Sequence, residues 1–179
     1  LAAFRLQLAV ERGDEKAVHE HWAVLDREYA GSRAWWNARI HDPEWVLGPG
    51  RPMPHWTFTD LSGATVSSGD LAGRPYLLDV WSTTCGPCLA EMPHLHAALG
   101  ALGGGASPIA FVGLSFDQDL VAVKKFREKW AMPWINLLAT EDQQMQLYAS
   151  WGFSGIPLTV LVGSNGEILA HGDQLRGDE

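Results

Sequence analysis

A nearly continuous apolar run, YLLDVW from Tyr76 to Trp81, most constrains how this chain can fold. An apolar run without alternation indicates a strand covered on both faces, as in sheets flanked by helices on either side. The only two cysteines of the chain, Cys85 and Cys88, follow this run, and apolar residues at helical spacing come next. The pair is therefore expected at a corner where a strand gives way to a helix.

The rest of the second half repeats this alternation of strands and helices. The stretch WTFTDLSGATV predicts a hairpin that turns at Ser62 and Gly63. Further strands are expected at PIAFVGLSF, PLTVLV and ILAH, with a short apolar stretch at 134–138. Helices are expected over 89–102, 123–130 and about 141–151. This order predicts an α/β sandwich with a central mixed sheet flanked by helices.

Residues 1–41 are expected to form a separate helical segment. Asp14 is a candidate N-cap and Gly31 a candidate stop for its main helix. The apolar stripe of that helix recurs at helical period: Val18, Trp22, Leu25 and Tyr29. We interpret the segment as packing on the main domain or on a partner.

A connector is expected between the helical segment and the main domain. Residues 42–54, DPEWVLGPGRPMP, contain four prolines and two glycines. Proline fixes φ and removes a backbone donor, so an extended connector is favoured over a helix or a central strand. The main domain then occupies residues 55–179.

The charge balance narrows the possible partners. Lys and Arg total 13 against 21 Asp and Glu, which gives a formal net charge of -8. A surface this acidic repels phosphate backbones and argues against nucleic-acid binding. The basic residues between Lys124 and Lys129 are interpreted as one solvated helix face. No apolar stretch is long enough to cross a bilayer.

The spacing of the two cysteines suits redox chemistry. Cys85 is expected at the helix start, where unpaired N–H groups and the helix dipole stabilise a thiolate. Such sites lower a cysteine pKa from about 8.5 to as low as ~3.5. Cys88, one turn deeper, is expected to be more buried and protonated. Gly86 is expected to allow a tight turn, and Pro87 suits an early helical position.

Thiol–disulfide exchange follows from this arrangement. Cys85 attacks a substrate disulfide, and Cys88 then attacks Cys85 and releases the reduced substrate. The competing interpretation is a structural cysteine pair or half of a zinc site. Zinc normally needs four ligands, and the chain has no second cysteine pair. His94 and His96 are two residues apart and so lie on different helix faces, and we expect no metal site.

From about Trp56 to Gly172 the sequence resembles the TlpA/ResA-like branch of the thioredoxin superfamily. The stretches that carry the resemblance are WTFTDLSGATVSSGDLAGRPYLLDVWSTTCGPCLAEMPHL, VGLSFDQD and WGFSGIPLTVLVGSNGEIL, in the order and spacing of the family. The resemblance implies a thioredoxin-like fold and a thiol–disulfide oxidoreductase.

Two acids acquire candidate roles from the resemblance. Asp79 lies six positions before Cys85, where thioredoxins keep a buried acid. A carboxylate inside an apolar strand is costly, so its pKa is expected to be raised, which suits a proton acceptor for Cys88. Glu91 matches an acid that the ResA-like branch places near the active site, although a first-turn Glu also favours any helix dipole.

The predicted substrate-binding surface surrounds Cys85. The resemblance implies that Pro157 is the cis-proline facing the cysteines, and that Trp81 packs under the active-site loop. Thr84 stands where the family usually has tryptophan, which removes an aromatic contact. The full predicted set is Gly86, Pro87, Ile156, Pro157, Trp81 and Thr84.

The resemblance also implies partners and a location. Protein thiols and disulfides are the expected substrates, with no cofactor beyond the Cys85–Cys88 couple. The Gly-Pro dipeptide and the buried acid favour the reducing direction, which requires a membrane electron donor. A periplasmic or other extracytoplasmic location is expected, with the cytoplasm as the alternative. The chain begins at Leu1 rather than Met, which is compatible with a removed signal peptide or anchor.

Three departures or alternatives stay open. The family ends with a helix after its last strand, at which GDQLRGDE only hints. Two explanations of the missing helix are open: the C-terminal end is trimmed, or the N-terminal helices cover the sheet face on which that helix packs in the family. Soft thiolates bind Cu(I), so a copper-binding protein using both cysteines and His171 is one other function. An adaptor that acts through the helical segment is another.

Overall fold

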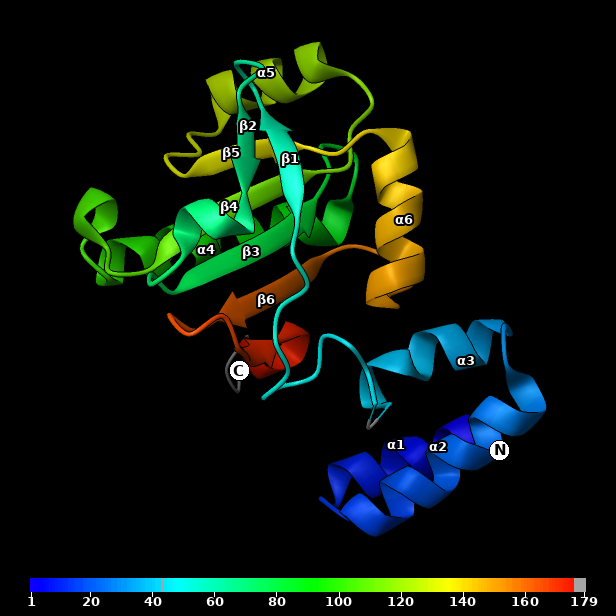
Figure 1. Ribbon diagram of the computed structural model, residues 1–179. Helices are drawn as coiled ribbons and strands as arrows, with labels where there is room; N and C mark the ends of the chain where they lie inside the picture. Colours follow the sequence, from blue (N-terminus) through cyan, green and yellow to red (C-terminus); the bar gives the residue numbers. More distant parts are fainter. Residues whose placement is uncertain (43, 176–179) are drawn as a thin grey trace.

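The computed structural model describes residues 1–42 and 44–175. Its centre is a seven-stranded mixed sheet in the order β2-β1-β5-β4-β3-β6-β7 (Figure 1). Strands β3, β4 and β5 run parallel to one another, and the remaining pairs are antiparallel. The strands are β1 Thr57–Asp60, β2 Thr65–Ser67, β3 Tyr76–Trp81, β4 Ala110–Ser115, β5 Ile135–Leu138, β6 Leu158–Val162 and β7 Ile168–His171. The predicted α/β class with a mixed sheet is confirmed.

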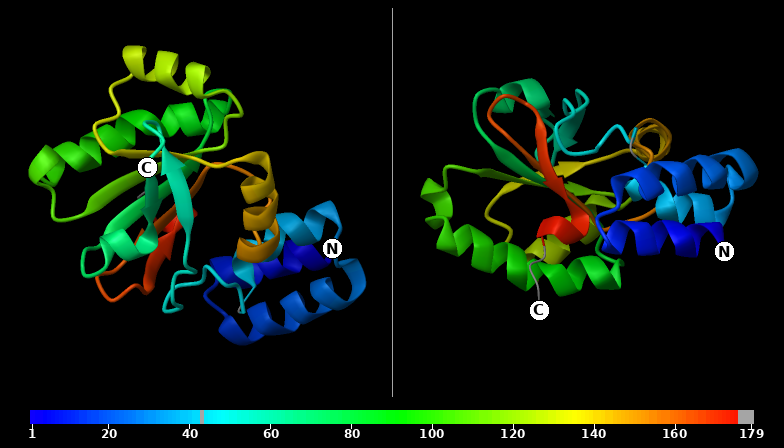
Figure 2. Two further views of the ribbon diagram at one scale, coloured as in Figure 1. Left: turned by 45° about the horizontal axis from the view of Figure 1, so that its top comes forward. Right: turned by 90° about the horizontal axis from the view of Figure 1, so that it is seen from below.

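Helices cover both faces of this sheet. Helices α4 (Gly86–Ala101) and α5 (Leu120–Lys129) pack on one face, and α6 (Glu141–Trp151) packs on the other (Figure 2). Side chains alternate along β3, so Leu78 and Val80 enter the core on the α6 side while Trp81 enters the core beneath α4. Short 3-10 helices are η2 Ser68–Leu71, η3 Gly104–Ala106 and η4 Gly172–Leu175. Both faces of β3 are therefore covered, as its apolar run predicts.

The parallel strands bring two loops to one edge of the sheet. In the β3–β4 register Trp81 lies opposite Ser115, the last residue of β4. The backbone N–H of Phe116 continues the ladder by donating to the Trp81 carbonyl oxygen at 2.8 Å. The loop leading to α4 and the loop leading to α5 therefore start side by side, and this edge carries the cysteines.

Local capping explains where the elements begin and turn. Thr140 and Gln143 form a reciprocal capping box at the start of α6. The Asp60 carboxylate closes the β1–β2 turn by accepting from Ser62 Oγ and from the N–H groups of Ser62 and Ala64. These hydrogen bonds, that of the Ser62 hydroxyl first, hold the pKa of Asp60 below its ordinary value. Gly152 ends α6 in the left-handed conformation, which favours glycine.

The N-terminal helices have a small core of their own. They are α1 Ala2–Glu11, α2 Glu15–Tyr29, α3 Arg33–Ala38 and the 3-10 helix η1 Arg39–His41. Leu6, Trp22 and Leu25 are buried between them, and the Asp14 cap is confirmed because its carboxylate accepts from the Ala17 N–H at 3.0 Å. Tyr29 was expected in the stripe, but it is 47% exposed. As the last residue of α2, it lies beyond the end of this core.

Residues 44–54 do more than space the two parts. Trp45 and Leu47 are 1% and 0% exposed and belong to the main core. The Trp45 Nε1–H donates to the carbonyl oxygen of Trp151, in the last turn of α6, at 2.7 Å. The N–H of Gly50 donates to Ile168 O at 2.8 Å. The connector is thus fastened along the α6 side of the sheet.

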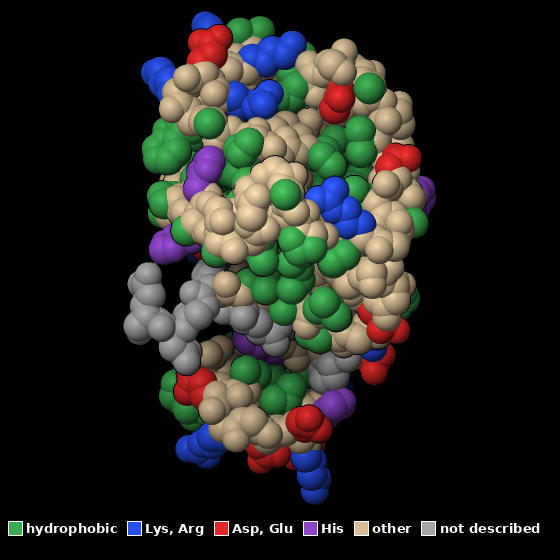
Figure 3. All heavy atoms as spheres, turned by 90° about the vertical axis from the view of Figure 1, so that its left-hand side faces the viewer, with side chains coloured by type: hydrophobic (Ala, Val, Ile, Leu, Met, Phe, Trp, Pro, Cys, Tyr) green, Lys and Arg blue, Asp and Glu red, His purple; other side chains and the backbone are tan. Residues whose placement is uncertain are grey.

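The chain has a formal net charge of -8, and its charged side chains are mixed on the face that Figure 3 shows. Positive and negative side chains are mixed at the top of the face in Figure 3, while hydrophobic side chains gather at its middle. Lys124, Lys125 and Lys129 are exposed on α5, as the interpretation of a solvated helix face requires. Arg127 does not fit this interpretation, because it is half-buried and donates to the Met132 carbonyl oxygen at 3.3 Å. No helix among the described residues is both long and apolar enough to cross a membrane.

The Trp45 contact generates a stability prediction. Trp45→Phe keeps an aromatic ring but leaves the buried Trp151 carbonyl without its donor, which should lower the free energy of unfolding by about 2 kcal/mol. Urea denaturation measures this loss. Trp130→Phe, at a side chain that is 44% exposed, is the matched control. A loss below about 0.5 kcal/mol for Trp45→Phe, the usual range for surface substitutions, would contradict the role given to this contact.

Candidate active site

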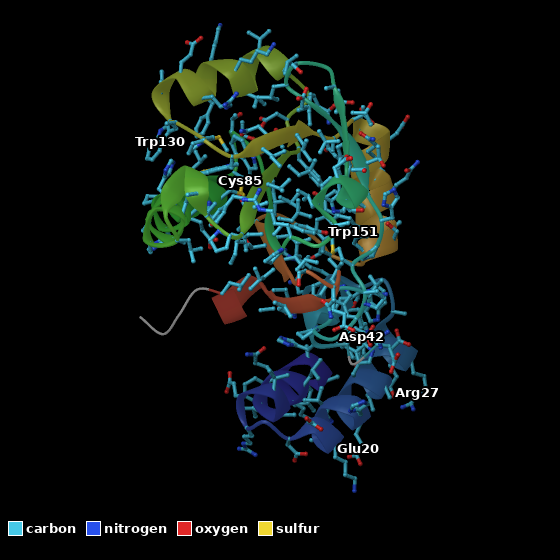
Figure 4. The ribbon with its side chains drawn as sticks, turned by 60° about the vertical axis from the view of Figure 1, so that its left-hand side comes forward. Glu20, Arg27, Asp42, Cys85, Trp130 and Trp151 are labelled. Carbon is cyan, nitrogen blue, oxygen red and sulfur yellow. A yellow bond between two sulfur atoms is a disulfide. The ribbon has the colours of Figure 1, made fainter. Side chains whose placement is uncertain are left out.

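Cys85 is the N-cap of α4, and Cys88 lies in its first turn. The backbone N–H of Cys88 donates to Cys85 Sγ at 3.2 Å, so the sulfur takes the place of the usual capping oxygen. The two sulfurs form a disulfide. Cys85 is half-buried, whereas Cys88 is 1% exposed. The predicted difference in burial between the two thiols is confirmed, and Figure 4 shows Cys85 in the body of the main domain, far from Glu20 and Arg27 on α2.

Two backbone contacts fix the surroundings of Cys85. The Cys85 N–H donates to the Ser82 carbonyl oxygen at 3.2 Å, which closes a turn after β3. Cys85 Sγ also lies 3.7 Å from the carbonyl oxygen of Ile156. The Ile156–Pro157 peptide bond is cis. The structure thus brings the predicted residues 156 and 157 to the sulfur, across 71 positions of sequence.

The other predicted contact residues differ in their placement. Trp81 is 1% exposed and lies beneath the active-site loop, with its ring centroid 5.2 Å from that of Phe126 and its side chain in the same core as Cys88. Thr84, Gly86 and Pro87 are exposed. The expected tight turn at Gly86 is wrong, because Gly86 is the first residue of α4 and has no positive φ. An added Cβ there would meet nothing within 4 Å.

Asp79 is buried in the sheet, as predicted. It is 6% exposed, and its Oδ1 accepts a hydrogen bond from Thr159 Oγ1 at 3.2 Å. Because side chains alternate along a strand, Asp79 lies on the same face of β3 as Trp81, which contacts the core that contains Cys88. The Asp79 carboxylate therefore lies on the same side of the sheet as Cys88, the resolving thiol. Its role as proton acceptor stays a prediction.

Glu91 lines a cavity of about 640 Å³ between α4 and the sheet. The lining also includes Pro87 on α4 and, on β6, Thr159, the hydrogen-bond partner of Asp79. No lining residue comes from the described N-terminal helices. The expectation that those helices cover this face is wrong, because the connector is fastened on the opposite, α6 side. Residues 176–179, the rest of the hinted terminal helix, lie outside the described residues.

One network beside the site is not anticipated by the sequence analysis. Asp117, in the loop after β4, accepts hydrogen bonds from the backbone N–H and the hydroxyl of Thr83. Thr83 lies two residues before Cys85. The signal in the sequence is that Asp117 follows a buried strand that ends at the same edge as β3, but only the register shows which loop it reaches.

Metal ligands are not clustered in the described part of the chain. No group of three or more His, Cys, Asp or Glu side chains there could hold an ion. His171, the third ligand of the copper alternative, packs its ring 4.7 Å from that of Trp45 on the α6 side. His96 packs against Trp134 at 5.0 Å. Nothing in this geometry favours the copper alternative.

Comparisons with known proteins agree on the type of site. A family model described as thioredoxin-like matches residues 73–168. The chain is 24% identical over 130 residues to the thiol-disulfide oxidoreductase ResA of Bacillus thuringiensis, over 73% of this chain and 70% of that protein. It is 28% identical over 142 residues to the thiol:disulfide interchange protein DsbE of Xylella fastidiosa, over 78% of this chain and 66% of that protein.

A solved structure supports the same conclusion. The thioredoxin domain of a thiol-disulfide oxidoreductase from Bacteroides vulgatus has a TM-score of 0.65 and 30% identity to this chain. The match covers 73% of this chain and 91% of that domain. Residues 73–168, which the family model matches, include both cysteines and the 156–157 bond.

The different burial of the two sulfurs predicts different reactivities. After reduction with dithiothreitol, iodoacetamide should modify Cys85 at least about tenfold faster than Cys88, because only the first thiol is open and capped by the helix start. Peptide mass spectrometry measures both rates. The same protein in guanidinium chloride is the control and should show similar rates. Equal rates in the folded protein would overturn the assignment of Cys85 as the attacking thiol.

Proposed function

Because the chain belongs to the TlpA/ResA-like branch of the thioredoxin superfamily and is a thiol–disulfide oxidoreductase, we propose that it reduces protein disulfides in the bacterial cell envelope. The observation that carries the proposal is the unequal pair at the start of α4. Cys85 is half-buried and caps the helix, while Cys88 is sealed beneath it. A partly exposed attacking thiol and a protected resolving thiol are what disulfide reduction needs.

The reaction starts from the dithiol form. The Cys85 thiolate attacks one sulfur of a substrate disulfide, forming a bond to it while the other substrate sulfur leaves as a thiolate and takes a proton from water. The first-turn N–H groups of α4 stabilise the charge on Cys85 before the attack. The substrate is then held to the protein through a mixed disulfide.

The second step returns the protein to the disulfide that the structure contains. Cys88 gives its proton to Asp79 and attacks Cys85 Sγ, which breaks the mixed disulfide and expels the second substrate thiolate. Two electrons have then moved from the cysteine pair to the substrate. Asp79 is favoured over Glu91 as the acceptor because it is buried on the same sheet face as the resolving thiol's core.

Substrate recognition is proposed to use the surface beside Cys85. The Ile156 carbonyl oxygen, 3.7 Å from the sulfur, is close enough to meet the backbone of a polypeptide joined to Cys85. Exposed Thr84, Gly86 and Pro87 lie beside it on the loop and first turn. This surface has no large aromatic side chain at position 84, so the geometry supports contacts to backbone more than to one preferred side chain.

The cellular setting is part of the proposal. The named relatives are bacterial ResA and DsbE proteins, which supports an extracytoplasmic location for this chain. A protein that reduces disulfides there must be reduced in turn, so a membrane electron donor is proposed as its second partner. The cysteine pair itself carries the electrons, and the proposed mechanism uses no other cofactor.

Insulin reduction with dithiothreitol tests the activity. The parent protein should accelerate precipitation of the insulin B chain, and Cys85→Ala should remove that acceleration because the attacking sulfur is gone. Lys124→Ala, on the exposed face of α5, is the control and should keep the parental rate. An unchanged rate for Cys85→Ala would rule out the proposed reductase.

Separate variants distinguish the two acids. Asp79→Asn should slow resolution of a preformed mixed disulfide by about 100-fold, because the buried proton acceptor is lost. Glu91→Gln should slow it by no more than about threefold, because Glu91 is part of the cavity wall. Rapid-quench mass spectrometry follows the mixed disulfide. The opposite order of effects would transfer the role to Glu91.

A further inference from the structure

We infer that Asp117 is a positioning residue for thiol–disulfide exchange: it ties the loop before Cys85 to the end of β4 and thereby holds the sulfur at the start of α4. The inference rests on the proposed function, because the loop matters only if Cys85 reacts. It concerns a residue outside α4, 34 positions after Thr83 along the chain.

The carboxylate of Asp117 makes hydrogen bonds in two directions. Toward the active-site loop, it accepts from the Thr83 hydroxyl at 2.6 Å and from the Thr83 backbone N–H at 2.9 Å. Toward the sheet, it accepts from the Ser115 hydroxyl at 2.7 Å. Bonds to a charged acceptor are shorter and stronger than neutral ones. Asp117 therefore forms a bridge rather than a single surface contact.

The sheet end of this bridge is rigid. Ser115 is 1% exposed, and it lies opposite Trp81 on one side and Leu138 on the other. Its hydroxyl also accepts from the Asp117 N–H at 3.0 Å, which fixes the turn after β4. The active-site loop is thus anchored, through Asp117, to a buried residue in the centre of the sheet.

The loop end of the bridge is adjacent to the nucleophile. Only Thr84 separates Thr83 from Cys85, and the Cys85 N–H is held by the Ser82 carbonyl. A loop anchored at position 83 leaves the sulfur little freedom to leave its capping position, 3.2 Å from the Cys88 nitrogen. Stabilisation of a thiolate by a helix start depends on this alignment and weakens within one turn.

The negative charge of Asp117 has an opposing effect. Placed near Cys85, a carboxylate disfavours a thiolate, so removal of the charge alone should make Cys85 more reactive. Loss of position should make it less reactive. Asp117→Asn removes the charge but keeps an oxygen for the Thr83 N–H and a nitrogen that donates to either hydroxyl. Asp117→Ala removes the charge and the hydrogen bonds together. Comparing the two variants therefore separates the effect of positioning the loop from the effect of the charge.

The experiment measures alkylation of a single thiol. All variants are made with Cys88→Ala, whose backbone N–H still caps Cys85, and the iodoacetamide rate is followed from acidic to alkaline pH. Asp117→Ala should lower the neutral-pH rate by about threefold to fivefold and move the pH midpoint upward. Asp117→Asn should restore at least the parental rate. Thr83→Val, which removes one donor, should act in the direction of Asp117→Ala with a smaller effect.

Asp119→Ala is the matched control, because Asp119 has the same charge in the same loop but caps α5 through the Val121 N–H. It should leave the alkylation profile at the parental values. If Asp117→Ala and Asp117→Asn raise the alkylation rate equally, Asp117 acts through its charge and the positioning role is wrong. If Asp117→Ala and Asp119→Ala lower the rate equally, the effect comes from the stability of the loop, and the positioning role is again wrong. If Asp117→Ala does not fold, an unchanged profile for Thr83→Val overturns the inference. No protein substrate is used, so failure of insulin reduction remains a separate result.

Discussion

The hydrogen bond from the Cys88 N–H to the Cys85 sulfur is the interaction on which the account of this site depends. It makes a sulfur the N-cap of α4, where the unpaired N–H groups of the first turn favour negative charge. The parallel pairing of β3 with β4 places that helix start beside the loop after β4. The sheet register therefore determines where the reactive sulfur lies, and the helix cap favours its thiolate form.

The two faces of the sheet have different roles, and the residues assigned to the chemistry lie on one of them. The α4 face carries the cysteine pair, Trp81 and Asp79, and the cavity lined by Glu91. The opposite face packs α6 and receives Trp45 from the connector. The N-terminal helices have their own core, and Figure 4 shows Glu20 and Arg27 on α2 far from Cys85. The cavity beside α4 stays open to solvent in the described part of the chain.

Much of this fold was predictable from local signals. The strand at Tyr76–Trp81 and the helix at Glu141–Trp151 were predicted correctly, because apolar runs and helical periodicity are strong there. The cysteine pair was also predictable, because the spacing of Cys85 and Cys88 is visible in the sequence. The Asp117 bridge was not predictable, because it depends on a register between two strands, and neither was the burial of Trp45, because proline content hides a packed connector. The tight turn predicted at Gly86 was wrong, because this residue has ordinary helical geometry at the start of α4.

The most direct test of the central claim is the pKa of Cys85 in the reduced protein, measured by the ultraviolet absorbance of the thiolate as pH is raised. The capped geometry predicts a midpoint at least about one unit below the ordinary cysteine value of about 8.5. A midpoint at or above that value would mean that the helix start does not stabilise the charge, and the sulfur would then have no advantage from its position at the cap.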